Sequence, residues 1–222
     1  DPGLILLPMY VNVLSPDEYG LYVVVVSIVE VLAPLLGMGL GFSILRSIVD
    51  SRTAKQDATI AGTAFIAFAI IAIPVAVFSL PLAKVASAFM FGDARHSFIF
   101  MLAFIAVLFS VLFELELQYI RAKKQSWLYL WVSVSKFLLF LGLNIWLVIF
   151  EDRGAEGIVL GTLLSSALIC IGSLVIIFRQ HRPGFSFTVL RDMARVGLPV
   201  VPAALIDSAA TAMDKYFLNT YA

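Results

Sequence analysis

Three polar residues in the last apolar stretch of the chain, residues 197–222, have a spacing that suits ion binding inside a membrane. Asp207, Thr211 and Asp214 stand at intervals of four and three residues, and a helix places such positions on one face. Two carboxylates and a hydroxyl on one face could bind a proton or a sodium ion. Such a stripe cannot face acyl chains, so it must face protein or a water-filled cavity. The spacing therefore predicts that something polar is carried across a membrane.

The composition is typical of a polytopic membrane protein. Hydrophobic residues make up 61% of the 222 residues and charged residues only 14%, whereas soluble domains contain about 25% charged residues. The 15 basic and 15 acidic residues balance each other, so net charge gives no indication of nucleic-acid binding. We expect an all-α protein whose helices cross the membrane several times.

The sequence carries no motif of a soluble enzyme or of a metal site. His96 and His181 fall in loops on opposite sides of the membrane and cannot share a metal. Cys170 is the single cysteine, which excludes an intrachain disulfide. There is no glycine-rich phosphate loop and no loop large enough for a catalytic domain. We therefore expect a protein that is not an enzyme and has no cofactor.

Membrane-spanning helices need about 17 to 25 mostly apolar residues. The segments that meet this length are residues 19–45, 58–83, 98–120, 127–150 and 157–178. Residues 3–14 are too short to span and are expected to be the end of a first helix, so residues 1–178 form one lobe and the chain is part of a longer protein. Residues 197–222 start a further helix. Gly37 and Gly41 have a spacing that allows another helix to approach closely.

Basic residues predict the orientation of these helices. The loops at residues 46–57, 121–126 and 179–196 contain most of the lysines and arginines, and basic loops remain in the cytoplasm. The last of the three also has the apolar and charged sides of a helix lying on the membrane surface. We expect a multi-pass protein of the plasma membrane with these loops on the cytoplasmic side.

Three charged residues are predicted to lie near the middle of the bilayer. At about 1.5 Å per residue, Glu30, Lys136 and Asp207 are each about 14 to 17 Å from a helix end. A charge at that depth costs about 2.5 to 3.5 kcal/mol, so each needs a partner, water or protonation. Ser133 and Asn144 share a helix face with Lys136, which favours a common cavity. The alternative is that Glu30 and Lys136 form a purely structural ion pair.

Two short motifs resemble those of a known family. The first is Leu14-Ser15-Pro16-Asp17-Glu18-Tyr19-Gly20-Leu21-Tyr22, and the second combines Gly197-Leu198-Pro199 with Met213-Asp214-Lys215-Tyr216-Phe217-Leu218. The chain resembles bacterial polysaccharide biosynthesis proteins, the Wzx-type flippases of lipid-linked oligosaccharides. Their superfamily also contains multidrug exporters and lipid II flippases. The resemblance implies two six-helix lobes around a central cavity that opens alternately to each side, of which this chain would hold the first lobe and the first helix of the second.

The resemblance also implies a substrate, an oligosaccharide on an undecaprenyl-type diphosphate that is moved to the outer leaflet for surface polysaccharide such as O-antigen. We expect Lys136 to neutralise the diphosphate, with Ser133, Asn144 and Glu30 lining the cavity. Asp207 or Glu30 would bind the coupling proton or sodium ion. Thr211 and Asp214 are further candidates for ion coupling. Other proteins of polysaccharide assembly are possible partners besides membrane lipid, and no nucleic acid is expected.

Two other functions stay open at the level of sequence. A multidrug exporter of the same superfamily would use the same carboxylates on cationic drugs, and Lys136 in the cavity argues against it. A membrane-embedded enzyme or scaffold of polymer assembly is the second alternative. Such an enzyme would carry a large outer loop, and no connection here exceeds about 18 residues, close to the usual lengths. Glu114 and Glu116 are interpreted as interfacial charges.

Overall fold

The computed structural model describes residues 10, 13–180, 184–208 and 210 of the chain, and they form helices joined by short turns. Five helices are long and apolar enough to cross a membrane, which confirms the predicted all-α membrane fold. These helices are α2 (Pro16–Gly37), α4 (Ala54–Val77), α6 (Ser97–Ala122), α7 (Ser126–Ile145), which continues as the π-helix η1 (Trp146–Phe150), and α8 (Gly154–Gln180).

Shorter helices lie between or after these spans. They are α3 (Leu40–Val49), α5 (Ser79–Phe91), α9 (Phe187–Gly197) and the 3-10 turn η2 (Leu198–Val200), and residues 201–208 are helical after it. The helix α9 forms within and just beyond the range in which a surface helix was expected. Its Met193 is buried while its charged side chains are exposed.

Two segments predicted as single helices are each divided into two. Residues 19–45 break where Met38 and Gly39 both adopt left-handed backbone angles, with φ of 45° and 66°, and this conformation ends a helix. Residues 58–83 break at Phe78, four residues after Pro74. A proline inside a helix removes one backbone hydrogen bond and weakens the turn around it. The breaks thus occur where the backbone is least suited to continue.

The start of α2 explains part of the first sequence motif. The Ser15 hydroxyl accepts a hydrogen bond from the Glu18 backbone N–H, and the Ser15 N–H donates to a Glu18 carboxylate oxygen at 3.0 Å. These reciprocal bonds form a capping box, and Pro16 occupies the first helical position, where its missing N–H has no cost. The Leu14–Tyr22 motif is therefore a strong helix start at one end of the molecule.

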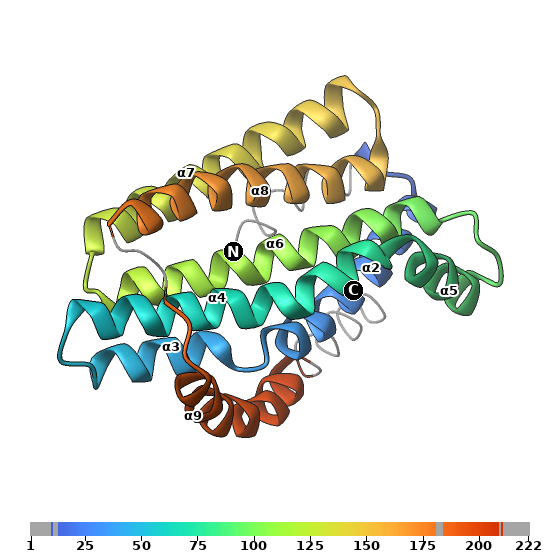
Figure 1. Ribbon diagram of the computed structural model, residues 1–222. Coiled ribbons are helices and arrows are strands. Elements are labelled where there is room, and N and C mark those ends of the chain that lie inside the picture. Colours follow the sequence, from blue (N-terminus) through green and yellow to red (C-terminus); the bar gives the residue numbers. More distant parts are fainter. Residues whose placement is uncertain (1–9, 11–12, 181–183, 209, 211–222) are drawn as a thin grey trace.

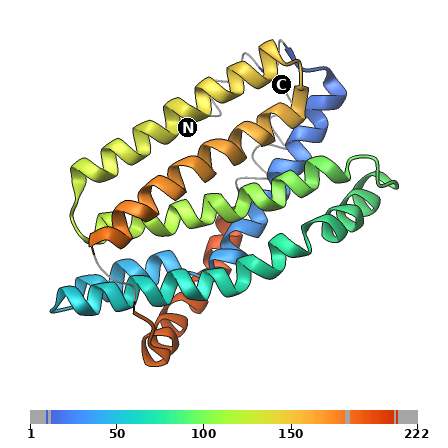
Figure 2. The ribbon, with the colours of Figure 1, turned by 45° about the horizontal axis from the view of Figure 1, so that its top comes forward.

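The helix α6 lies at the centre of the bundle. It has the largest buried share of the five spans and contacts α2, α3, α4, α5, α7 and α8. The antiparallel pair α7 and α8 packs on one side of it, and α2, α3 and α4 lie on the other (Figures 1 and 2). Because α6 lies between most of these two groups, although α2 also contacts α8, side chains on its opposite faces have different neighbours.

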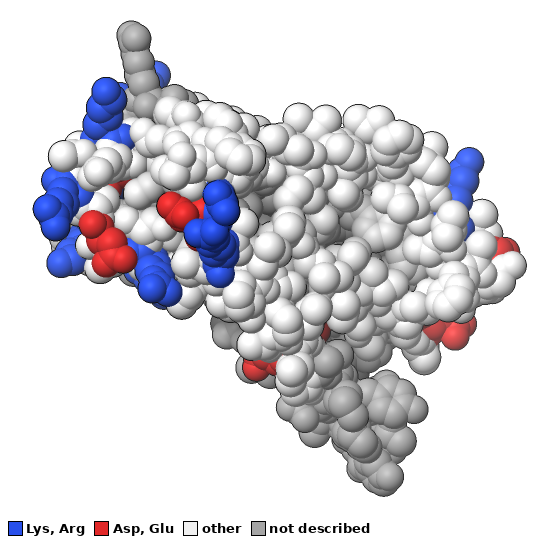
Figure 3. All heavy atoms as spheres, turned by 60° about the horizontal axis from the view of Figure 1, so that its bottom comes forward, with Lys and Arg blue, Asp and Glu red and all other residues white. Residues whose placement is uncertain are grey.

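Lysine and arginine side chains gather at one end of the molecule. Figure 3 shows them around the turns at its left side, with a broad uncharged region beyond. Nine described basic residues belong to this basic end: Arg46, Arg52, Lys55, Arg121, Lys123, Lys124, Arg179, Arg191 and Arg195. The uncharged band has the form expected of a surface that faces acyl chains, and the chain is a multi-pass membrane protein.

An ion pair joins two turns within this basic end. The Lys123 ammonium lies 2.6 Å from Asp57 Oδ2, and the Ser51 hydroxyl donates to Asp57 Oδ1. Asp57 lies in the first turn of α4, and Lys123 follows the end of α6. The carboxylate of Asp57 is therefore held from both turns, and it fixes the α3–α4 connection to the end of the central helix.

Candidate functional site

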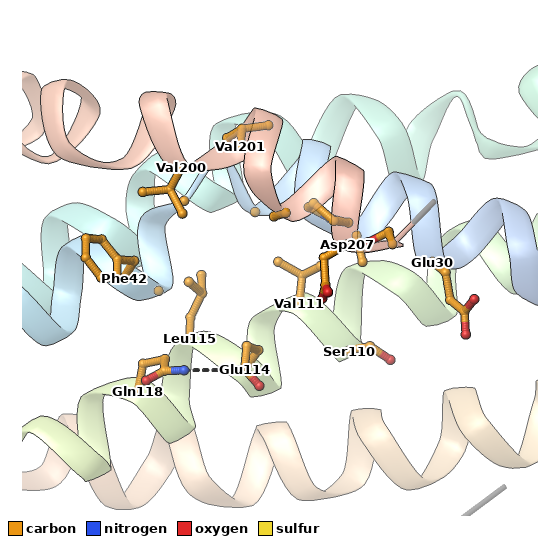
Figure 4. A pocket seen from close by; sticks show the side chains of 17 residues that line it. Glu30, Phe42, Ser110, Val111, Glu114, Leu115, Gln118, Val200, Val201 and Asp207 are labelled. Carbon is orange, nitrogen blue, oxygen red and sulfur yellow. Dashed lines mark hydrogen bonds between the residues drawn. The ribbon is translucent and has the colours of Figure 1, made fainter. Parts of the chain in front are cut away.

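A cavity of about 530 Å³ lies between α2, α3 and α6 on one side and residues 200–208 on the other. Residues 200–208 follow the connecting helix α9, so this cavity lies between the first lobe and the start of the next part of the chain. Figure 4 shows carboxylate side chains at its wall from three different elements. The polar side chains that line it are Glu30, Ser110, Glu114, Gln118, Asp207 and Ser208.

One face of α6 supplies half of these polar side chains. Ser110, Glu114 and Gln118 are four residues apart from each other, so they form one stripe along the helix. The Gln118 amide donates to Glu114 Oε1 at 2.6 Å. The Gln118 carbonyl oxygen is buried and has no hydrogen-bond partner among the described residues. This stripe therefore offers an amide oxygen and a carboxylate to whatever occupies the cavity.

Glu30 and Asp207 reach the same cavity from two separate helices. Glu30 lies one turn before Pro34 on α2, and Asp207 belongs to the helical residues 201–208. The structure thus brings together the two mid-bilayer carboxylates that the sequence singled out as ion-binding candidates (Figure 4). Thr211 and Asp214, the other members of the predicted stripe, lie outside the described residues.

Lys136 is not brought to this cavity. Its ammonium group lies 3.8 Å from the centroid of the Phe113 ring, an arrangement that stabilises a cation at the face of an aromatic ring. It interacts electrostatically with Glu114 and Glu116, which both come from α6. Glu30, Lys136 and Asp207 were expected to share one cavity, but Lys136 does not line it. Depth along a helix does not decide which neighbour a side chain faces.

Ser133 and Asn144, which were expected to line the cavity beside Lys136, also lie elsewhere. The Ser133 hydroxyl is buried and has no hydrogen-bond partner among the described residues. Asn144 is fully buried, accepts a hydrogen bond from the Tyr10 hydroxyl at 3.1 Å and donates to the Phe140 carbonyl at 2.8 Å. Asn144 therefore links residue 10 to α7 inside the first lobe.

Glu114 and Glu116 differ from their interpretation as interfacial charges. Glu114 lines the cavity, whereas Glu116 is fully buried and accepts a hydrogen bond from the Ser173 hydroxyl of α8. The sequence held a signal for the first, because Ser110, Glu114 and Gln118 repeat at helical spacing. It held none for the second, since Glu116 lies outside this stripe, among the apolar residues of a helix that is contacted on several sides.

The residues of the cavity provide oxygen atoms and no described cation. Lysine and arginine are absent from the described residues that line it. Groups of three or more histidine, cysteine or acidic residues that could hold a metal ion are likewise absent from the described part of the chain. The arrangement can accept hydrogen bonds, attract a cation or bind a proton.

Comparisons with known proteins agree with this architecture. The family model described as polysaccharide biosynthesis protein matches residues 3–222. A crystal structure of a MATE mutant has a TM-score of 0.71 at 19% identity, and it covers 99% of this chain and 53% of its own. The outward-facing conformation of a multidrug resistance MATE family transporter of the MOP superfamily has a TM-score of 0.70 at 18% identity. The match covers 99% of this chain and 52% of that transporter.

These likenesses concern the fold. The chain spans about half the length of the two solved structures, in agreement with the expectation of one lobe and the start of a second. No curated protein matches the chain. Both solved structures share the fold of this chain, which confirms the predicted all-α fold.

Proposed function

Because the chain belongs to the polysaccharide biosynthesis protein family, we propose that it forms the first half of a transporter for lipid-linked oligosaccharides. The transporter would turn an oligosaccharide on a lipid diphosphate from the cytoplasmic to the outer leaflet of the plasma membrane for surface polysaccharide synthesis. The basic end seen in Figure 3 would face the cytoplasm.

The observation that carries this proposal is the cavity between the first lobe and residues 200–208, which is lined by six polar side chains among apolar ones. A sugar head group has many hydroxyls and cannot cross the acyl region without hydrogen-bond partners, because an unsatisfied polar group there costs several kcal/mol. The lipid tail can remain in the bilayer beside the two lobes. A cavity between lobes is also the place where alternating access would act.

Glu30 and Asp207 are the candidates for ion coupling in this proposal. They line one cavity from two elements, α2 and residues 201–208, so binding of a proton or sodium ion would change the attraction between two parts that must move apart. Lys136 is not assigned to the diphosphate, since its ammonium lies over Phe113. Thr211 and Asp214 keep their role as further candidates.

One observation favours a second function, the export of cationic compounds. Three carboxylates line the cavity, from Glu30, Glu114 and Asp207, and a cation would be attracted by them. Lys136 was the sequence argument against such cargo, and that argument is weakened because Lys136 does not line the cavity and acts on it only through Glu114. The fold shared with a multidrug resistance MATE transporter is compatible with this function. The third alternative, an enzyme or scaffold of polymer assembly, gains no support from either solved structure.

The test is a deletion strain complemented with the full-length protein. We expect the deletion to accumulate lipid-linked sugar in the inner leaflet and the wild-type gene to clear it. Asp207→Asn and Glu30→Gln should each reduce clearance at normal expression. Glu151→Gln is the matched control. Glu151 is an exposed carboxylate in the turn after η1, at the end of the molecule opposite the basic end.

Two results would contradict the proposal in different ways. Clearance at the wild-type rate in both cavity variants would remove Glu30 and Asp207 from the mechanism. A deletion strain with no accumulated lipid-linked sugar, but with increased sensitivity to cationic drugs, would replace the flippase by the exporter of cationic compounds.

A further inference from the structure

We propose that a groove at the basic end binds the phosphate group of an anionic membrane lipid. The groove has a volume of about 460 Å³ and lies between the α3–α4 connection and residues 186–189 at the start of α9. It shares no lining residue with the cavity described above. A lipid can bind there whichever cargo the transporter carries, so this site does not depend on the proposed function.

Two cations line this groove without a carboxylate partner. The Arg52 guanidinium and the Lys55 ammonium form no ion pair with a described residue. By contrast, Lys123 at the same end of the molecule is already paired with Asp57. Asp50 is the single acidic residue in the described lining. Two positive charges against one negative charge leave the groove with a net positive charge, which attracts an anion.

Hydrogen bonds fix the turn that presents these cations and leave donors for a ligand. The Arg52 N–H donates to the side-chain oxygen of Gln56 at 3.0 Å, and the Gln56 N–H donates to the Thr53 hydroxyl at 3.3 Å. Since the Gln56 oxygen is used within the turn, its amide NH₂ group is left to donate. The hydroxyls of Ser47 and Ser186 also line the groove and can donate. Phosphate oxygens are strong acceptors that bind best to such cations and donors together.

Apolar side chains at the groove favour a lipid over a soluble phosphate. Phe185 and Phe187 flank the lining residue Ser186, and they are 51% and 73% exposed. Exposed aromatic rings beside the uncharged band (Figure 3) suit the boundary between lipid head groups and acyl chains. Ile60 and Val189 line the groove itself and offer apolar contact to the first carbons of a lipid. A lipid meets both the cations and these apolar groups, whereas a soluble phosphate meets the cations alone.

The experiment titrates the purified full-length protein in a neutral detergent with phosphatidylglycerol and measures the bound lipid by native mass spectrometry. Phosphatidylcholine, whose head group has no net charge, and inorganic pyrophosphate, which has no acyl chain, are titrated in the same way. We expect phosphatidylglycerol to bind at least about tenfold more tightly than either of them. Equal binding of phosphatidylcholine would overturn the proposal, because charge would not be recognised. Binding of pyrophosphate as tight as that of phosphatidylglycerol would overturn the choice of a lipid in favour of a free phosphate.

Three double variants test whether the lipid binds in this groove. Arg52→Gln with Lys55→Gln should weaken phosphatidylglycerol binding at least about tenfold, and both residues are exposed, so the fold should be unaffected. Arg52→Lys with Lys55→Arg keeps both charges and should retain most of the binding. The matched control is Arg191→Gln with Arg195→Gln, which removes the same charge from exposed positions of α9 outside the groove. This control should change binding by less than about threefold at physiological salt.

Two results with these variants would overturn the proposal. Equal losses in the groove variant and in the α9 control would show that the lipid responds to the total charge of the basic end. Binding at the wild-type level after loss of both Arg52 and Lys55 charges would show that the groove is not the site. Because binding and not transport is measured, either result would leave the proposed function standing.

Discussion

Replacing Gly39 with alanine should detach the connecting helix α9 from the first lobe. Gly39 has a φ of 66°, and a Cβ atom there would lie 2.6 Å from the Gly197 carbonyl carbon and 2.7 Å from its Cα. Both are backbone atoms, so no side-chain rotation can relieve the contact. The left-handed conformation costs an L-residue about 1 to 2 kcal/mol, and overpacking of a close contact costs about 1 to 3 kcal/mol. Together these two costs predict that Gly39→Ala lowers the free energy of unfolding by about 2 to 5 kcal/mol.

The reciprocal change tests the same contact from the other side. A Cβ on Gly197 would lie 2.8 Å from the Met38 carbonyl oxygen and 2.9 Å from the Gly39 carbonyl oxygen. Gly197 itself has a φ of −77°, so Gly197→Ala carries the overpacking cost without backbone strain and should be the milder variant.

Thermal unfolding of the purified protein in detergent measures these losses, and we expect Gly39→Ala to lower the apparent Tm by about 5 to 10 °C. Gly142→Ala and Gly172→Ala are matched controls, because both glycines lie inside long helices and a Cβ there would meet nothing within 4 Å. Both controls should be neutral or stabilising by up to about 1 kcal/mol. If Gly39→Ala unfolds at the wild-type temperature, Gly39 and Gly197 are not in backbone contact and the predicted joint is wrong.

Two further predictions concern polar contacts inside the protein. Asp57→Asn should lower the free energy of unfolding by about 1 to 2 kcal/mol, because its ion pair with Lys123 is only partly exposed. Exchanging the charges in an Asp57→Lys, Lys123→Asp double variant should recover part of that loss. A double variant that is less stable than both single variants would contradict the pairing. Tyr10→Phe removes the hydroxyl that donates to Asn144 and should cost about 0.5 to 2 kcal/mol in the same unfolding assay. A wild-type Tm in Tyr10→Phe would refute that bond.

The spans could be predicted from the sequence because the bilayer imposes one length on every crossing helix. The interruption at Met38 could not be predicted, whereas Pro74 is a sequence signal for the interruption at Phe78. Gly37 and Gly41 were interpreted through helix packing, and α6 does approach them, with Val111 and Gln118 side chains 3.6 and 3.2 Å from the two Cβ positions. That interpretation missed a second role of the three glycines at positions 37, 39 and 41. Gly39 allows the left-handed turn that follows the end of α2.

The sequence could predict a depth for each candidate residue but not the direction in which its side chain faces. Counting residues from a helix end placed Glu30 and Asp207 halfway through the membrane, and both line one cavity. The same count applied to Lys136, which faces Phe113 instead. Direction depends on which helices pack against each face, and α6 is contacted on several sides. Glu114 and Glu116 illustrate this. They are only two residues apart on α6, yet Glu114 lines the cavity and Glu116 is fully buried.

In the proposed transporter, the attachment of α9 would determine where its two halves pivot. The Ser43 hydroxyl of α3 donates to the Met193 carbonyl of α9 at 2.8 Å, and Gly197 at the end of α9 lies against Gly39. The connecting helix is thus a rigid extension of the first half and would travel with it. After α9 the chain passes through the 3-10 turn Leu198–Val200, where Pro199 is followed by Pro202. A swing of the second half would therefore originate at that turn, about two helical turns below Asp207, so a small rotation there would displace this carboxylate relative to Glu30.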